Sequence, residues 1–145
     1  IKKMIPGRQV LIKNEEVLLY NFIEEQERQE VQQFFTALHI NPIVVKQEDY
    51  CQKVGYLLGL TGFSVVEKNN EGDFDFSHKV MVFHNIKNKR LDDVLAKLHN
   101  ASIATPYKAV VTPLNRFWSL KRLCLTMYKE HGAVIEQKKK QEKNV

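Results

Sequence analysis

The segment from Thr112 to Ser119 holds the residues of this chain whose types and spacing are best suited to chemistry. Thr112 and Asn115 carry groups that donate and accept hydrogen bonds. Arg116 adds a forked cation, and Trp118 is the only tryptophan of the chain. The segment lies between an apolar run expected to be a strand and an amphipathic pattern expected to be a helix. Anions and ligands are often bound at such junctions, so this loop is our first candidate binding site.

Two interpretations of the loop remain open. In the first, the loop recognises a peptide, a phosphate or a base, and Trp118 stacks on the ligand. In the second, Thr112 and Asn115 bond the backbone of their own loop, while Phe117 and Trp118 fill the core beneath it. We favour the second interpretation.

The sequence contains no catalytic, cofactor or metal motif. The six glycines are scattered, so no phosphate-binding loop is expected, and neither a G-x-S-x-G elbow nor an H-E-x-x-H motif occurs. Of the five histidines, only His84 lies at the C-terminal end of an expected central strand, where α/β proteins place ligands. Cys51 and Cys124 have apolar neighbours at helical spacing, which is typical of buried free thiols in a reducing cytoplasm. These features favour a non-enzymatic cytoplasmic protein without a cofactor, in which His84 is a further ligand candidate.

The elements that must position these residues occur twice. Two apolar runs of strand length, Val17–Asn21 and Val80–His84, begin 63 residues apart. Each is followed by an amphipathic helix pattern, a second short strand and a further helix pattern. The helices end at Leu38 and Leu98, the second strands are Ile43–Val45 and Ala109–Val111, and the last helix patterns start near Asp49 and Ser119. This repetition predicts the architecture before any activity is known.

Each copy reads as strand–helix–strand–helix, which requires parallel strands with a right-handed crossover. The first strands lack polar residues over most of their length, as expected for strands covered on both faces. We therefore predict an α/β fold in which two repeats share one small, mostly parallel sheet, with a possible extra strand at Val10–Ile12. The predicted single domain spans residues 1–145, with repeat one at about 16–62, a connector at 63–78, repeat two at about 79–131 and a basic tail at 132–145.

Local signals add detail to this plan. Asp49 and Gln52 form a capping-box pattern at the start of a helix with an apolar stripe, and Gly55 within it predicts close packing. Asn88 and Ser119 are expected to cap the two helices of the second copy. In the connector, Phe74 and Phe76 alternate with acidic residues, which is compatible with a short edge strand.

One run of the second copy resembles a known family. The sequence from Lys108 to Leu120, KAVVTPLNRFWSL, is similar to the K-A-V-x-T-P-x-N-x-x-W-[ST]-L signature of a bacterial domain-of-unknown-function family, number 3783. The family domain would cover roughly residues 79–131, and the segment Val54–Leu60 also resembles a stretch upstream in such proteins. The resemblance implies no reaction, substrate or cofactor, so it marks Thr112, Pro113, Asn115 and Trp118 as family residues without giving them a role.

Charge is distributed unevenly along the chain. Residues 1–78 have a balance of −4 and residues 79–145 a balance of +9. The basic half predicts an anion-binding surface as one alternative, and attraction between the halves or idle solvated charge as the other. Nucleic acid is therefore a possible partner that we do not favour. The polyanion candidates are Lys89, Arg90, Lys108, Lys121 and Arg122, together with Arg116.

Three functions from different classes compete. We favour a non-enzymatic binding or assembly module, because short apolar strands leave sheet edges for a protein partner or a second copy. A polyanion binder is the first alternative, and it requires its basic residues to share a face. A small-metabolite sensor or enzyme is the second, and it requires a concave pocket beside His84, Thr112 and Asn115. No apolar run is long enough to cross a membrane, and no signal peptide is expected.

Overall fold

The computed structural model describes residues 14–67, 74–103 and 107–130 of the 145-residue chain. The elements, in chain order, are β1 (Glu16–Tyr20), α2 (Glu25–Ala37), β2 (Asn41–Val45), η1 (Gln47–Cys51), α3 (Val54–Leu57), β3 (Val80–His84), α4 (Asn88–Asn100), β4 (Tyr107–Val110) and η2 (Asn115–Phe117). Residues 120–130 are helical as well, and we call them the last helix. The expected strand at Val10–Ile12 and the basic tail lie outside the described residues.

The four strands form one sheet in the order β2-β1-β3-β4. β1 pairs in parallel with β2, and β3 pairs in parallel with β4. The two central strands, β1 and β3, are antiparallel, with Leu18 opposite Val82 at the centre. The predicted α/β fold with one small, mostly parallel sheet is thus confirmed, and the antiparallel joint between the two halves is an addition to it.

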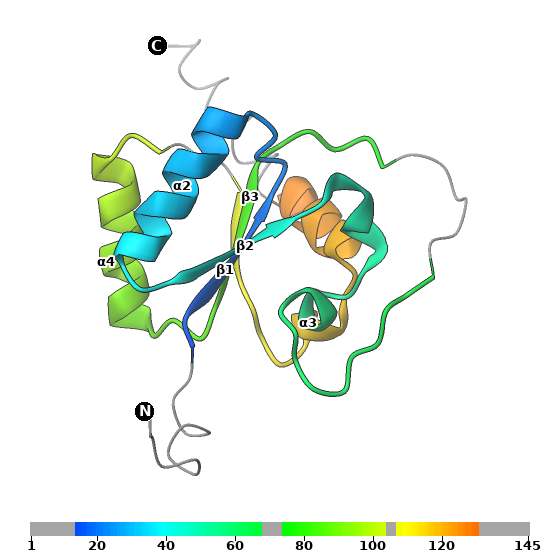
Figure 1. The fold of residues 1–145 in the computed structure, drawn as a ribbon. Coiled ribbons are helices and arrows are strands. Elements are labelled where there is room, and N and C mark those ends of the chain that lie inside the picture. The colour runs from blue at the N-terminus through cyan, green and yellow to red at the C-terminus, as the bar shows by residue number, and fades with distance from the viewer. Residues whose placement is uncertain (1–13, 68–73, 104–106, 131–145) are drawn as a thin grey trace, which may run out of the picture.

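Helices cover both faces of the sheet (Figure 1), with α2 and α4 on one face and α3 and the last helix on the other. Side chains of β1 alternate between two apolar clusters. Val17 and Leu19 pack with α2 and α4, whereas Leu18 and Tyr20 pack with α3 and the last helix. All four are almost completely buried, which explains why the strand shows no polar alternation.

The chain leaves both central strands through the same kind of turn. Asn21 follows β1 and Asn85 follows β3, and both adopt a positive φ, 67° and 62°. The Asn21 Nδ2 donates to the carbonyls of Phe76 and His78 at 2.9 Å each. The Asn85 Nδ2 donates to the Asn14 carbonyl at 3.1 Å. Because β1 and β3 are antiparallel, each asparagine ties the end of one strand to the segment that enters the other.

A second contact joins the halves away from the sheet, and it corrects one expected helix. Lys53 and Ser119 form an isolated antiparallel bridge. The Val54 amide donates to the Trp118 carbonyl, and the Leu120 amide donates to the Gln52 carbonyl, both at 2.9 Å. Residues 52 and 53 must be extended to make these bonds, so the continuous helix expected from Asp49 is wrong. The segment forms η1, an extended step, and then α3.

Other local expectations have mixed outcomes. The Ser119 Oγ accepts from the Arg122 amide at 3.1 Å, which confirms this cap. A Cβ on Gly55 would lie 2.5 Å from the Phe63 ring, which confirms the close packing. Asn88 is not a cap, because α4 starts at that residue after Lys87 and has no side-chain cap bond. The predicted edge strand at Phe74 and Phe76 is also wrong, since these residues are irregular and their rings stack on each other at 5.4 Å.

Candidate functional site

A cleft of about 1140 Å³ lies at the carboxyl ends of β3 and β4. The residue after each strand, the turn into α4 and the loop into η2 contribute to its walls. The lining residues are Asn14, Glu15, His39, Leu60, His84, Asn85, Ile86, Lys87, Arg90, Val110, Val111, Thr112, Pro113 and Arg116. The cleft therefore brings together three of the predicted ligand candidates, His84, Thr112 and Arg116, but not Asn115 or Trp118.

Lys87 and Arg116 are cationic residues of the cleft lining. Lys87 immediately precedes α4, and no side chain caps that helix within the described residues. The first amide N–H groups of a helix have no partner inside it and carry partial positive charge. Among the described carboxylates, none forms an ion pair with Lys87 or Arg116. The cleft lining therefore offers an anion two cations and the N-terminus of α4.

The loop that closes the cleft is rigid because it bonds to itself. The Asn115 Oδ1 accepts from the Thr112 amide at 2.7 Å, and the Asn115 Nδ2 donates to the Val110 carbonyl at 3.0 Å. The Thr112 Oγ1 accepts in turn from the Asn115 amide at 3.0 Å. These are the bonds expected from the second interpretation of the loop, in which Thr112 and Asn115 bond the backbone of their own loop. Asn115 is therefore buried as a brace, and Arg116, which follows it, is exposed at the cleft.

The two aromatic residues after Arg116 have different environments. Trp118 is half-buried against the core, and the Arg122 guanidinium lies 4.2 Å from its ring centroid. Phe117 is 53% exposed and contacts the ring of Phe63, with the centroids 5.2 Å apart. The expectation that both rings fill the core thus holds for Trp118 and fails for Phe117. Neither lines the cleft.

His84 is held in place by a carboxylate. Its Nδ1 lies 3.1 Å from the Glu16 Oε1, across the antiparallel pair β1–β3, and both side chains are largely buried. A carboxylate at Nδ1 fixes the orientation of the imidazole ring and leaves Nε2 for another partner. The sequence placed His84 at a strand end, but Glu16 could not be linked to it without the register of the two central strands.

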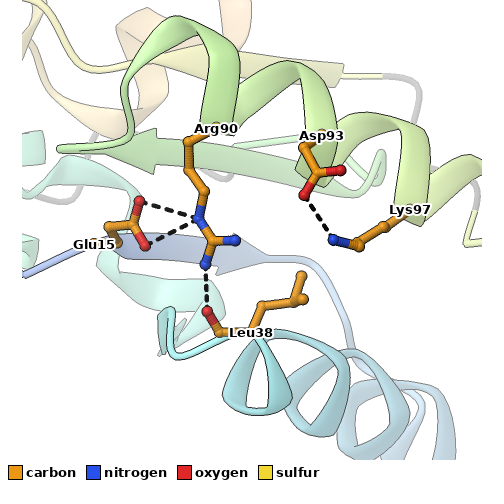
Figure 2. A network of polar contacts seen from close by, with 5 residues as sticks. All are labelled: Glu15, Leu38, Arg90, Asp93 and Lys97. Carbon is orange, nitrogen blue, oxygen red and sulfur yellow. Dashed lines mark hydrogen bonds and ion pairs between the residues drawn. The ribbon is translucent and has the colours of Figure 1, made fainter.

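Arg90 supports the cleft wall from α4 (Figure 2). Its Nε donates to both carboxylate oxygens of Glu15, at 3.2 and 3.3 Å, and its guanidinium also donates to the carbonyl of Leu38. Leu38 is the C-terminal cap of α2, so this one side chain joins both helices of one layer to the start of β1. Arg90 was predicted as a polyanion candidate, and the structure places it in these internal contacts instead of free in solvent.

The remaining polyanion candidates are divided between two layers. Lys89 belongs to α4, whereas Lys121 and Arg122 belong to the last helix on the opposite face of the sheet. Lys108 lies on the edge strand β4, and burial lowers the pKa of its amine. Because a polyanion needs cations along one surface, this division argues against a continuous binding face.

Two residues that line the cleft were not identified from the sequence. Lys87 and His39 both line it, but a single lysine or histidine in a polar turn gives no signal of its own. In the ranges 14–67, 74–103 and 107–130, no group of histidine, cysteine or acidic residues could hold a metal ion. No helix of the same ranges combines the length and the apolar character needed to cross a bilayer.

The model of a domain of unknown function, DUF3783, matches residues 79–134. The family resemblance of the second copy is thus confirmed over this range. The matched region contains β3, α4, β4 and the loop from Thr112 to Ser119, so DUF3783 contributes most of the cleft, including His84, Lys87 and Arg116. Glu15, His39 and Leu60 reach the cleft from outside the matched region. No curated protein and no solved structure matches the chain.

The equivalent place in the first half differs in size and chemistry. A smaller hollow of about 300 Å³ lies at the carboxyl ends of β1 and β2, lined in part by Asn21, Ile23 and Val44. There the N-terminus of α2 is capped by its own chain, because the Glu24 carboxylate accepts from the amides of Gln26 and Glu27 at 3.1 and 2.8 Å. The first half thus supplies its own anion at the position where the DUF3783 half has an uncapped helix and Lys87.

Proposed function

We propose that this protein is a non-enzymatic binding module that holds an anionic group in the cleft at the carboxyl ends of β3 and β4. The main observation behind this proposal is that two cations, Lys87 and Arg116, line one cleft without a carboxylate partner among the described residues. Two like charges at one site repel each other, and a bound anion relieves that repulsion.

The comparison between the halves supports the same conclusion. In the first half, a carboxylate already occupies the first turn of α2. In the second half, the first turn of α4 has neither an acidic residue nor a side-chain cap. His84 and Thr112 add polar groups to the cleft lining, and Glu16 fixes the orientation of His84. A bound anion would accept hydrogen bonds from the first amides of α4, as the Glu24 carboxylate does from those of α2.

The test is isothermal titration calorimetry with two probes, succinate and inorganic phosphate, at fixed ionic strength. We expect saturable binding of at least one probe. Arg116→Gln and Lys87→Gln should each weaken that binding by about tenfold, the effect of losing about 1.4 kcal/mol of charge-assisted interaction. Both side chains are exposed, so neither substitution should change the urea midpoint appreciably.

Lys121→Gln is the matched control. It removes the same charge from the last helix, outside the cleft and on the opposite face of the sheet from α4. Binding that falls equally in Lys121→Gln and Arg116→Gln would indicate a general effect of net charge and would refute the proposal. The absence of saturable binding by either probe at millimolar concentration would refute it as well.

A polyanion function is supported by a different observation. A shallow groove of about 330 Å³ on the last helix is lined by Lys121, Arg122 and Lys129 together with exposed Leu125. If this groove bound single-stranded nucleic acid, affinity would fall steeply with salt and with Arg122→Gln, and would be unchanged by Arg116→Gln. The two functions are therefore separated by which arginine matters.

The organisation of the chain belongs to the same proposal. We propose one domain over residues 1–145, made of two copies of one unit at about 16–62 and 79–131, joined by a connector at 63–78 and followed by a basic tail at 132–145. The matching asparagines after β1 and β3, and the reciprocal bonds across Lys53 and Ser119, support a common origin of the copies. A cytoplasmic location with two free thiols, and a second copy as partner, are part of this proposal.

A further inference from the structure

The lining of the cleft at the ends of β3 and β4 contains two chemically different groups of residues. The cations and polar residues described above form one group. The other group is apolar and comes from three separate parts of the chain. Its residues are Leu60, Ile86, Val110, Val111 and Pro113. An anion such as phosphate would pair with the first group and would leave the apolar group in water.

Apolar residues of the cleft lining and of the adjoining loop are also exposed. Val110 is 43% exposed, and the neighbouring loop residues Leu114 and Phe117 are 68% and 53% exposed. Isolated exposed apolar side chains are normal, but a cluster that borders a concave site often marks a ligand surface. The Phe117 ring contacts the Phe63 ring, and the Phe63 ring packs closely against Gly55, so these contacts hold Phe117 in place.

The volume of the cleft also favours a ligand with an apolar part. At about 1140 Å³ the cleft has room for a ligand much larger than an inorganic anion, since pockets for organic ligands typically span roughly 300–1000 Å³. Such sites combine apolar walls with a few polar groups that set orientation, which is the division seen between Val110 and Arg116. The anion thus accounts for one end of the ligand, and the remaining volume accounts for an apolar body.

We propose that the ligand of this cleft is an amphipathic carboxylate, a small molecule with one carboxylate at Lys87 and Arg116 and a hydrocarbon body against apolar residues of the lining such as Leu60, Val110 and Pro113. This inference rests on the proposed function, because it assigns a chemical class to the anion held there. The Glu24 carboxylate that caps α2 is the internal precedent for the charged end.

The experiment is calorimetric titration with the unbranched carboxylates acetate, butyrate, hexanoate and octanoate at constant ionic strength. Each methylene buried against the apolar residues of the lining should tighten binding by about fourfold, the ratio that corresponds to about 0.8 kcal/mol. Hexanoate should therefore bind more tightly than succinate, which carries a second charge and no apolar end. Arg116→Gln should weaken every member of the series by a similar factor.

Val110→Thr tests the apolar group of the lining, and Val44→Thr is its matched control. The two valines occupy equivalent places in the halves, on edge strands β4 and β2, and are 43% and 40% exposed. Val110→Thr should weaken hexanoate and octanoate several-fold while leaving acetate unchanged, whereas Val44→Thr should leave all four unchanged. Urea midpoints of the two variants, measured in parallel, should agree with each other and show that both fold.

The outcomes separate this inference from the proposed function. If affinity is flat from acetate to octanoate but still falls in Arg116→Gln, the amphipathic ligand class is refuted and the anion site stands. An equal effect of Val110→Thr and Val44→Thr also refutes the ligand class. If octanoate binds with a strength that does not depend on Arg116, both the ligand class and the anion site are refuted.

Discussion

Replacing Asn115 by alanine should destabilise the protein, because this side chain braces the loop that closes the cleft. The Asn115 side chain is 9% exposed and makes two bonds to the backbone. Its Oδ1 accepts from the Thr112 amide at 2.7 Å, and its Nδ2 donates to the Val110 carbonyl at 3.0 Å. Alanine removes both partners at once and leaves the two backbone groups without them.

The magnitude follows from the surroundings of those groups. A hydrogen bond contributes about 0.5–1.5 kcal/mol net, and a buried group left without a partner costs about 1–3 kcal/mol. Thr112 and Val110 are themselves exposed, so water can reach part of what Asn115 releases. We therefore take about 1 kcal/mol for each bond and expect a loss of about 2 kcal/mol. For a domain of this size that loss lowers Tm by about 6–8 °C.

The assay is urea unfolding followed by circular dichroism, with Asn100→Ala as the matched control. Asn100 is the exposed last residue of α4, so the same substitution there should change the free energy of unfolding by less than about 0.5 kcal/mol. Thr112→Val should have an intermediate effect, because it removes only the hydroxyl that accepts from the Asn115 amide. A loss below about 0.5 kcal/mol in Asn115→Ala, with an unchanged m-value, would refute the assignment of Asn115 as a brace.

Three further predictions test the core and the surface. Gly55→Ala should lose about 1–3 kcal/mol in urea unfolding, because its Cβ would lie 2.5 Å from the Phe63 ring, and a neutral result would contradict the packing. Burial raises the pKa of the Cys124 thiol to about 12, so the folded protein keeps a proton that the unfolded chain releases. Stability should fall as pH rises from about 9 to 12, by up to about 1.4 kcal/mol per pH unit from this group, and Cys124→Val should remove that part of the slope measured by pH-dependent unfolding. Lys97→Met should change stability by less than about 0.5 kcal/mol in the same assay, because its ion pair with Asp93 is exposed, and a loss above 1 kcal/mol would show a role that the structure lacks.

Patterns within a few residues were enough to predict the two central strands and helix α2. The run Val80–His84 coincides with β3, and Val17–Asn21 differs from β1 by one residue at each end. Both strands are recognisable because both of their faces are buried, which forces an unbroken apolar run. Helix α2 follows the same logic, since Val31 and Phe35 fall on one buried face at helical spacing.

Features that depend on distant partners could not be predicted. The antiparallel pairing of β1 with β3 joins segments 64 residues apart in register at Leu18 and Val82, and no local signal encodes its direction. The break between η1 and α3 has the same origin, because Lys53 is held extended by its bridge to Ser119. Sequence patterns favoured a continuous helix there, and a tertiary contact overrode them.

In the candidate site, too, local patterns identified some residues, whereas the role of others depends on distant contacts. His84, Thr112 and Arg116 could be selected because they follow predicted strands, and the structure brings them to one cleft. Lys87 could not be selected, since its importance comes from the missing cap of α4 and from the lack of an ion pair with any described carboxylate. Arg90 was selected for its charge, but its bonds to Glu15 and Leu38 are visible only when both layers are in place.

The most direct test of the cleft is a titration of ¹⁵N-labelled protein with hexanoate, followed by NMR chemical shifts of the backbone amides. An anion at the N-terminus of α4 should perturb the amides of Asn88 and Lys89 most, together with that of Arg116. The amides of Gln26 and Glu27, already bonded to Glu24, should move little and serve as the internal control. Saturable shifts confined to the first group are the predicted result. Shifts of equal size in both groups, or saturable shifts only on the last helix, would contradict the account.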